Sequence, residues 1–552
     1  MEKIWLKTYM QGVPAEINPD SYDSLADLFT QCCEKFADKP AFSNMGTVIS
    51  FRELEKQATA FAAYLQHKLG LRQGERIGLM MPNILQYPVA MFGALKAGLI
   101  VVNVNPLYTA RELVHQLSNA EVDTIVILEN FTSVLQEALA QVSVKNIIVT
   151  QFGDLFPCPK ALLINFVVKY IKKMVPAWDI PQAIRFKEAL KQGAQTKFTA
   201  CKVKGDDIAF LQYTGGTTGV AKGAELSHRN LLANIMQVYA WTDHLTEEGK
   251  EIIITALPLY HIFSLTANCL TFFKLGAHNI LVTNPRDIPQ FIKLLKKVPF
   301  TIMTGVNTLF NALLNHPEFH QVDFKHLRFV IGGGMSVQKA VAERWQGITG
   351  VPILEGYGLT EASPVVCVNP LNIQAHTGSI GLPLPSTEIK ICDEAGNELP
   401  IGEIGELWVK GPQVMRAYWR APEETQKILT PEGWLLTGDM AKLDEAGFVY
   451  LVERKKDLII VSGFNVYPTE IEDILARHPG VLEAAVIGVS STKTGEAVKA
   501  FIVKKDSNLT EEEIIAFCRK QLTAYKVPKQ VEFRTELPKS NVGKVLRRKL
   551  RE

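Results

Sequence analysis

The chain has 552 residues, 47% of them hydrophobic, so it can bury large cores, and its length suggests about two to four structural units. Lysine plus arginine total 59 against 57 acidic residues, and this balance gives no bias toward nucleic acid as a partner. The eight cysteines show neither metal-ligand spacing nor a disulfide framework, which favours a reducing cytoplasm.

The amino-terminal region alternates helical and strand patterns. Residues 1–20 lack the apolar run and cleavage site of a signal peptide, and no apolar stretch reaches membrane-spanning length, so we expect neither. Residues 51–68 repeat apolar side chains at helical spacing and predict a helix. Apolar runs at 75–82, 122–128 and 145–150 predict strands. The alternation indicates a parallel sheet covered by helices.

Residues 160–178 mix large apolar side chains with Asn165, Lys169, Lys172 and Lys173 at helical spacing. This pattern is typical of a basic amphipathic helix, which lies on a membrane surface or turns its apolar side to the protein core. The core packing is the more common arrangement. The membrane alternative gains weight if the substrate is a lipid.

Residues 213–230 form a glycine-rich stretch, with four glycines and three threonines around Lys222. Glycine permits positive φ, so successive backbone N–H groups can turn inward and bind an anion. The P-loop template G-x-x-x-x-G-K-[ST] does not fit, because three residues separate Gly215 from Gly219 and Gly223 follows Lys222. The stretch therefore indicates phosphate binding of another kind, with a plain surface loop as the alternative.

Further strands follow at 251–260, 300–305, 327–334 and 352–361, and the last two carry glycines where α/β sheets place ligands. From about residue 380 to 450, short segments separated by Gly, Pro and Asp predict antiparallel sheet or a distorted barrel. The tail predicts strands at 483–489, 497–505 and 530–537 and a helix at 511–522, a small α+β unit. Internal repeats and low-complexity linkers are absent.

Six motifs occur in a fixed order: residues 213–230, 257–265, 355–364, 434–441, 453–472 and 537–548. Together they resemble the adenylate-forming superfamily of acyl-CoA synthetases, peptide-synthetase adenylation domains and luciferases. Within it, residues 17–29, 80–98, 101–117 and 258–270 are similar to those of bacterial long-chain fatty-acid–CoA ligases. The resemblance covers nearly the whole chain.

The resemblance implies a multi-domain α/β fold. Residues 1–455 would form a large domain of two α/β parallel-sheet subdomains plus a distorted β-barrel at about 380–450. Residues 456–552 would form a small mobile α+β domain that carries the catalytic lysine.

The resemblance also implies two reactions at one site. A fatty-acid carboxylate attacks the α-phosphate of MgATP and releases pyrophosphate, and the CoA thiol then displaces AMP from the acyl-adenylate. The glycine-rich loop would hold the leaving pyrophosphate, and catalysis would consist largely of positioning and cationic stabilisation.

The catalytic residues implied are Lys544, His261, Glu361 and Thr214, with Glu361 and Thr214 as Mg²⁺ contacts. Lys544 would reach the α-phosphate and the acyl carboxylate. Composition alone would favour a solvated lysine in a basic tail, and the surrounding motif at 537–544 reverses that judgement. ATP would contact residues of the motifs: Tyr213, Thr214, Gly215, Gly216, Thr217, Thr218, Gly219, Lys222, Gly333, Gly334, Glu355, Gly356, Tyr357, Gly358, Thr360, Asp439 and Arg454.

Lys456 matches the hinge of the superfamily, so the small domain would rotate there between the two reactions. The rotation would bring Ser462, Gly463 and Phe464 to the path of CoA. Some long-chain members carry a tryptophan gate just beyond His261, where this chain has Leu265 or its neighbours, so the gating of an acyl tunnel stays open.

The chemistry of the residues alone indicates a hydrophobic carboxylic acid, and "long-chain" comes from the resemblance. The alternatives are a fatty acyl-AMP ligase, a peptide-synthetase adenylation domain, and a lipid- or nucleotide-binding protein without catalysis. We expect a cytoplasmic protein in peripheral contact with the inner face of the cytoplasmic membrane and without a nucleic-acid partner. The sequence leaves the oligomeric state open, with a homodimer as one option.

Overall fold

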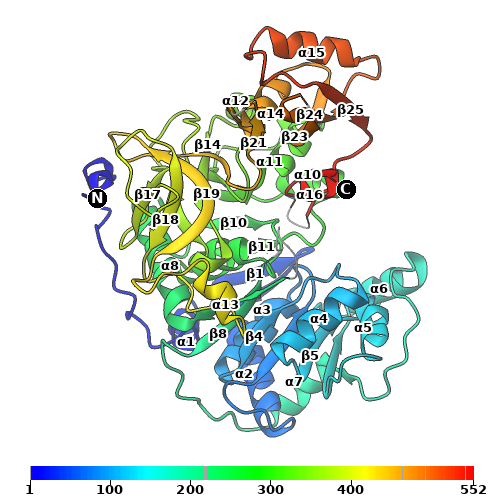
Figure 1. Ribbon diagram of the computed structural model, residues 1–552. Coiled ribbons are helices and arrows are strands. Elements are labelled where there is room, and N and C mark those ends of the chain that lie inside the picture. The colour runs from blue at the N-terminus through cyan, green and yellow to red at the C-terminus, as the bar shows by residue number, and fades with distance from the viewer. Residues whose placement is uncertain (1, 215–220, 463, 492, 541–542, 552) are drawn as a thin grey trace.

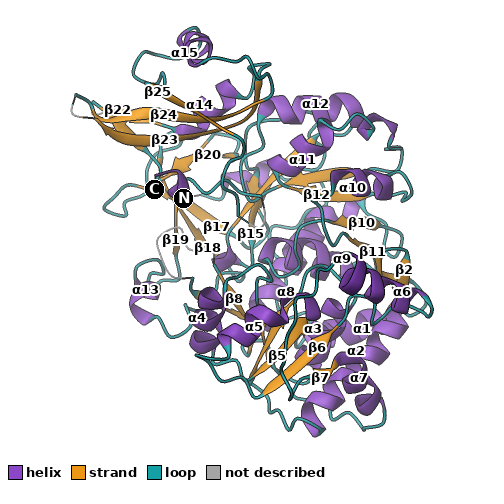
Figure 2. Ribbon diagram, turned by 90° about the vertical axis from the view of Figure 1, so that its right-hand side faces the viewer, coloured by secondary structure: helices purple, strands orange, loops and turns teal. Residues whose placement is uncertain are grey.

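The computed structural model describes residues 2–214, 221–462, 464–491, 493–540 and 543–551 (Figure 1). Within these ranges the strands form four sheets. In Figures 1 and 2 the sheet that contains β3, β5 and β8 lies at the opposite end of the molecule from the sheet that contains β23–β25. The other two sheets lie between them.

The sheet at the amino-terminal end is mostly parallel, and its order is β7 (Ile184–Arg185), β6 (Asn146–Thr150), β5 (Thr124–Leu128), β3 (Arg76–Met80), β4 (Ile100–Asn103), β8 (Ile208–Tyr213), β9 (Gly223–Ser227). Only the β8–β9 pair is antiparallel among these described strands. The strands predicted at 75–82, 122–128 and 145–150 are therefore confirmed. Nearly all their side chains are buried, as expected of a sheet covered on both faces.

The second sheet has the order β16 (Leu382–Pro383), β15 (Val365–Val368), β14 (Ile353–Gly358), β13 (Phe329–Gly332), β12 (Ile302–Gly305), β10 (Ile252–Thr255), β11 (His278–Leu281), β1 (Pro40–Asn44), β2 (Thr47–Ser50). From β14 to β1 the pairs are parallel. The carboxyl ends of β13 and β14 therefore lie at one edge, where their glycine-containing loops meet.

The β-rich region forms an antiparallel sheet of β17 (Glu388–Cys392), β18 (Gly405–Lys410), β19 (Leu435–Leu443) and β20 (Val449–Arg454). The small carboxyl-terminal sheet has the order β22 (Phe464–Val466), β21 (Ile459–Val461), β24 (Gly495–Lys504), β23 (Val481–Ser491), and β25 (Gln530–Arg534) pairs with β24. The mixed α/β fold with parallel sheets and a small carboxyl-terminal α+β unit is thus confirmed.

The longer helices cover the two parallel sheets and the small sheet. They are α1 (Leu25–Lys35), α2 (Phe51–His67), α3 (Gln86–Lys96), α4 (Ala110–Ala120), α5 (Thr132–Ala138), α6 (Lys160–Phe166), α7 (Phe186–Ala194), α8 (His228–Thr242), α10 (Ile288–Leu295), α11 (Asn307–Leu314), α12 (Lys339–Thr349), α14 (Pro468–Leu475) and α15 (Glu511–Arg519). Shorter ones are α9 (Thr271–Lys274), α13 (Pro422–Gln426) and α16 (Arg548–Arg551), and a π-helical turn spans Ser264–Leu270.

Local sequence signals explain where these helices begin. Ser50 caps α2 by accepting a hydrogen bond from the Glu53 N–H. Ser227 with Asn230 closes a capping box at α8, which fixes the direction of the chain just after the glycine-rich loop. The apolar face predicted for residues 51–68 is buried in the core.

The segment 160–174 differs from the more common arrangement considered for it. Helix α6 ends at Phe166 and a π-helical turn follows from Val167 to Ile171, and within α6 only Ala161 is buried. Its large apolar side chains are exposed instead of packed in the core: Leu162, Leu163, Phe166, Tyr170, Ile171 and Met174. Lys169 does not extend to solvent with the other lysines, because its Nζ lies 3.1 Å from the buried Glu129 carboxylate. The core-packing alternative is therefore wrong for this segment.

Candidate active site

A cavity of about 1000 Å³ lies where the carboxyl ends of β8, β13 and β14 face the β19–β20 edge and the small carboxyl-terminal unit. It is lined by most of the residues that the motifs predicted within the described chain: Tyr213, Thr214, Lys222, His261, Gly333, Gly334, Glu355, Gly356, Tyr357, Gly358, Thr360, Glu361, Asp439, Arg454, Lys456 and Lys544. Segments more than 300 residues apart in sequence thus meet around one cavity.

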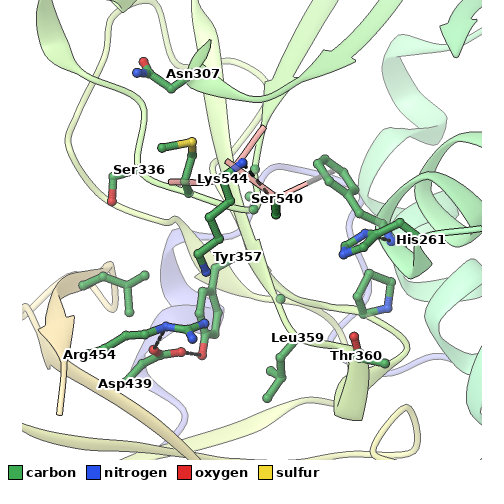
Figure 3. Close-up of a pocket in the computed structure, with 18 of the residues that line it drawn as sticks. His261, Asn307, Ser336, Tyr357, Leu359, Thr360, Asp439, Arg454, Ser540 and Lys544 are labelled. Carbon is green, nitrogen blue, oxygen red and sulfur yellow. Dashed lines mark hydrogen bonds and ion pairs between the residues drawn. The ribbon is translucent and has the colours of Figure 1, made fainter. Parts of the chain in front are cut away.

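One wall carries a chain of polar contacts between Tyr357, Asp439 and Arg454 (Figure 3). The Tyr357 hydroxyl donates to Asp439 Oδ2 at 2.6 Å, and Arg454 Nε lies 3.3 Å from Asp439 Oδ1. Asp439 and Arg454 are directly opposite each other on β19 and β20, so the strand register sets this ion pair. The carboxylate is thereby held in place at the cavity wall.

Lys544 extends from the small unit into the cavity, and Figure 3 shows its side chain directed toward Tyr357. Its backbone is fixed by a tight turn, in which Ser540 N–H donates to the Lys544 carbonyl at 2.7 Å and Lys544 N–H donates to Ser540 Oγ at 3.1 Å. Burial, reinforced by the nearby Arg454, lowers the pKa of Lys544 to about 8, although Asp439 opposes this shift. The lysine is thus poised for an anionic partner.

His261 lines the cavity on the side opposite Arg454 in Figure 3. Burial, with a smaller contribution from Lys544, lowers the pKa of His261 to about 4. The imidazole is therefore neutral at pH 7. A neutral ring can orient a carboxylate by donating one hydrogen bond, but it adds no positive charge.

Glycines at the ends of β13 and β14 bring backbone to the cavity surface. A Cβ at Gly358 would lie 2.1 Å from the Pro364 carbonyl oxygen, so only glycine fits there. Gly334 has a φ of +74°, and a Cβ at Gly333 would press on the Phe263 ring at 3.0 Å. These features match a wall that a flat ring could approach closely.

Glu355, on β14, lies beneath this wall. Its Oε1 accepts a hydrogen bond from Val337 N–H at 2.9 Å, and burial raises its pKa to about 8. Its carboxyl thus holds the loop before α12 in place, although it also lines the cavity.

The phosphate side of the cavity is described only in part. Gly215, Gly216, Thr217, Thr218 and Gly219 lie outside the described residues, as does Gly463. At the base of the loop, Thr214 N–H donates to the Lys222 carbonyl at 2.9 Å, which closes the two ends of the loop on each other.

Two residues of the 411–424 region hold the charged groups at this end. The Tyr418 hydroxyl donates a short hydrogen bond to Glu361 Oε1, and Lys222 forms an ion pair with Glu424. Lys222 Nζ also lies 5.1 Å from the centre of the Tyr418 ring. Tyr418 and Glu424 were not predicted from the sequence, because tyrosine and glutamate are common residues and neither position belongs to a recognisable motif.

The donor set at this end suits Mg²⁺ held partly by phosphate. Among the described residues, no group of three or more His, Cys, Asp or Glu side chains is arranged to bind a metal ion. Glu361 and Thr214 both line the cavity. A hard cation that keeps few protein ligands and takes phosphate oxygens fits such a sparse set.

Of the residues expected on the CoA path, the described ones, Ser462 and Phe464, do not line the cavity. Ser462 N–H donates to the Thr494 carbonyl at 2.8 Å in the turn between β21 and β22, and Phe464 is exposed with its ring stacked 5.0 Å from Tyr525. Lys456, the expected hinge, does line the cavity. Its pKa is lowered mainly by burial and, to a smaller extent, by the positive charge of Arg454.

Part of the cavity lining is apolar, and we call this part the apolar arm. It is lined by Val238 and Trp241 of α8, by Ala267 and Phe272, by strand residues of β13 and β15, and by Leu371 and Ile380. Part of the run after His261 therefore lines the arm, as expected, whereas Leu265 is fully buried outside the cavity lining. Trp241 was not predicted, because an aromatic residue within an apolar helix is most often a core residue.

Comparisons with known proteins agree with this arrangement. A family model described as AMP-binding enzyme matches residues 29–419, and a model described as AMP-binding enzyme C-terminal domain matches residues 470–544. A protein of Escherichia coli O6:H1 named long-chain-fatty-acid–CoA ligase is 59% identical over 552 residues, which is 100% of this chain and 98% of the relative. A protein of Bacillus subtilis (strain 168) with the same name is 40% identical over 556 residues, with 100% and 98% covered.

Among solved structures, an anthranilate CoA ligase in complex with anthranoyl-AMP superposes with a TM-score of 0.86 at 25% identity, covering 97% of this chain and 98% of that one. The first family model alone spans more than half of the residues, and the E. coli relative is matched along the entire chain. This chain belongs to the AMP-binding enzyme family.

Proposed function

We propose that this protein is a long-chain fatty-acid–CoA ligase that uses ATP, Mg²⁺ and CoA. The observation that carries the proposal is the convergence of Lys544 with the Asp439–Arg454 pair in a cavity that continues into an apolar arm. The names of the E. coli and B. subtilis relatives support the same substrate class.

In the first reaction, Lys544 stabilises the negative charge that develops when the fatty-acid carboxylate attacks the α-phosphate. Asp439 accepts hydrogen bonds from the ribose hydroxyls, and Tyr357 and Arg454 hold its carboxylate in position. The glycines of β13 and β14 form the adenine side, and neutral His261 orients the acyl carboxylate. Thr214 and Lys222 hold the base of the loop that retains the leaving pyrophosphate.

Glu361 and Thr214 would hold Mg²⁺, which neutralises phosphate charge when bound. Lys222 pairs with Glu424 in this structure, and the remaining N–H groups of its ammonium would contact phosphate. Tyr418 keeps Glu361 oriented by donating to one of its oxygens. The second Glu361 oxygen would remain available to hold the cation.

The second reaction requires a different orientation of the small domain, which we place at 456–552 with Lys456 as hinge. Lys544 lies in the cavity, whereas Ser462 and Phe464 lie outside it. A rotation about Lys456 would withdraw Lys544 and bring the 462–464 turn to the acyl carbonyl, where the CoA thiol attacks.

Mass spectrometry of the products from purified protein, MgATP and fatty acids from octanoate to oleate, with and without CoA, tests the proposal. We expect AMP, pyrophosphate and acyl-CoA, with the highest rates for long chains. Acyl-adenylate that accumulates despite CoA would indicate a fatty acyl-AMP ligase instead. Transfer to a carrier protein in preference to CoA would indicate an adenylation domain, and ATP binding without pyrophosphate release would indicate a non-catalytic protein.

We further propose that residues 162–174 contact the inner face of the cytoplasmic membrane. Leu162 is 67% exposed and Ile171 63% exposed, and Lys172 and Lys173 lie beside them. Exposed large apolar side chains next to lysines favour an interface between acyl chains and anionic headgroups. Among the described residues no helix has both the length and the apolar composition for a membrane crossing.

Flotation with vesicles of phosphatidylglycerol and phosphatidylethanolamine tests this contact. We expect Phe166→Ser combined with Ile171→Ser to lower the vesicle-bound fraction several-fold. Lys68→Ser, an exposed lysine on the end of α2, is the matched control and should float like the native protein. Equal flotation of all variants would refute the contact.

A further inference from the structure

Glu453 is a buried carboxylate on β20 that receives most of its hydrogen bonds from the small carboxyl-terminal unit. Its side chain is 4% exposed. Glu453 Oε2 accepts from Thr469 N–H at 3.1 Å and from Thr469 Oγ1 at 2.8 Å, and Oε1 accepts from Arg547 Nη1 at 2.9 Å. Among the described residues, the only further donor to this carboxylate is the backbone N–H of the neighbouring Arg454, 2.9 Å from Oε1.

The two sides of this contact belong to different parts of the fold. Glu453 pairs with Met440 across β19 and β20, so its backbone belongs to the four-stranded antiparallel sheet β17–β20. Thr469 is in the first turn of α14, where N–H groups have no partner within the helix. The Glu453 carboxylate thus accepts a hydrogen bond from a free N–H group at the start of α14, a helix that follows Lys456 in the sequence. The dipole of α14 favours the negative charge of this carboxylate.

The Arg547 guanidinium is oriented toward Glu453 by Glu472, which belongs to the same small carboxyl-terminal unit as Arg547. Glu472 on α14 accepts from Arg547 Nε at 3.2 Å and from Nη2 at 2.7 Å, a two-point contact that fixes the guanidinium plane. Glu472 is itself fixed, because its Oε1 also accepts from Val486 N–H at 2.8 Å. The remaining guanidinium nitrogen then points at Glu453.

The same short segment carries Lys544 into the cavity. Arg547 follows Lys544 by three residues, and Gly543 immediately precedes Lys544. The Gly543 carbonyl accepts from Thr308 Oγ1 of α11 at 3.1 Å, and a Cβ at Gly543 would lie 2.6 Å from that hydroxyl. Contacts with the large domain therefore fix the segment on both sides of Lys544.

We propose that Glu453 and Arg547 are positioning residues whose buried ion pair holds the small domain in the orientation that places Lys544 in the cavity. The pair thereby favours acyl-adenylate formation over thioester formation. A rotation about Lys456 moves Thr469 and Arg547 away from Glu453, and a buried carboxylate left without partners is costly unless water reaches it. This inference rests on the proposed function.

The test measures the two reactions separately on full-length protein. Acyl-adenylate formation is followed without CoA, and thioester formation is followed from supplied acyl-adenylate plus CoA. We expect Glu453→Gln, which keeps the shape but removes the charge, to slow the first reaction at least about tenfold and to leave the second within about twofold. Arg547→Lys, which loses the two-point geometry, should shift the ratio of rates in the same direction.

Lys526→Met is the matched control, because Lys526 forms an ion pair with Glu470 inside the small unit at 2.7 Å and touches no large-domain residue in that pair. It should leave the ratio unchanged. Equal slowing of both reactions by Glu453→Gln and by Arg547→Lys would overturn the proposal, since that pattern indicates a purely structural role. If the native protein catalysed neither reaction, the proposed function would fail instead.

A second readout reports domain orientation without any reaction. Asn311 Nδ2 on α11 donates to the Leu482 carbonyl of the small unit at 3.2 Å. In the double variant Asn311→Cys with Leu482→Cys, a short bis-maleimide should therefore join the two thiols. We expect Glu453→Gln to lower the cross-linked fraction several-fold, and an unchanged fraction would overturn the proposal.

Discussion

The charge of Lys544 should control the first reaction between pH 7 and 10. Burial and the nearby Arg454 lower the pKa of Lys544 to about 8 from its ordinary value of 10.5. The protonated form, which stabilises the developing charge, is therefore present below pH 8 and is lost as the pH rises through 8. In kcat/KM for ATP, which reports the free enzyme, we expect acyl-adenylate formation to fall about tenfold per pH unit above this value.

Removing the cation should cost about as much as removing one donor from an oxyanion site, about 3–4 kcal/mol or 10²–10³-fold in rate. Lys544→Ala should therefore slow acyl-adenylate formation by this factor and abolish its dependence on pH above 8. Lys544→Arg, if active, should stay active to higher pH, since a guanidinium keeps its proton.

Pyrophosphate release without CoA measures this reaction, and acyl-CoA formation from supplied acyl-adenylate serves as the control. The second reaction should be nearly unchanged in Lys544→Ala, because CoA requires the lysine to leave the cavity. Equal loss in both reactions, or a native profile that stays flat from pH 7 to 10, would refute the assignment.

Three further changes test other parts of the site. Asp439→Asn should raise KM for ATP about tenfold or more, because Tyr357 and Arg454 then face a neutral amide, and an unchanged KM would contradict the ribose contact. Gly358→Ala should lower the Tm and the activity together, since its Cβ would lie 2.1 Å from the Pro364 carbonyl oxygen, whereas Gly347→Ala, which has open space, should not. Lys456→Pro should leave acyl-adenylate formation within a few-fold and slow thioester formation strongly, and two native half-rates would argue against the hinge.

The parallel sheets were predictable because their strands are buried on both faces and read as continuous apolar runs between helical patterns. Helix α2 and strands β3, β5 and β6 lie where the pattern placed them. The sequence pattern after residue 160 did not show whether its apolar side chains are buried or exposed, because helical spacing does not say which neighbour covers the apolar side. Only the fold shows that Leu162 and Ile171 remain exposed.

The site was predictable where the resemblance assigns a role to a motif residue, as with Asp439, Glu361 and Lys544, all of which line the cavity. It was not predictable for Tyr418, Glu424 or Arg547, which act through partners far away in sequence. Arg547 lies within a basic tail where composition indicates a solvated side chain, yet it contacts three carboxylates, those of Glu453, Asp457 and Glu472.

Under the proposed function, one orientation of the small domain does not serve both reactions. Lys544, Ser462 and Phe464 all belong to this small domain, and of these three described residues Lys544 is the one that lines the cavity. Asp439 and Arg454 lie on β19 and β20, outside the small domain, so under the proposed rotation the nucleotide would keep its contacts while the small domain exchanges one face for another. The exchange must break the contact between Glu453 and Arg547, which lies beside the hinge rather than at the reacting atoms. Its strength can therefore set the balance between the two reactions without altering the chemistry of either.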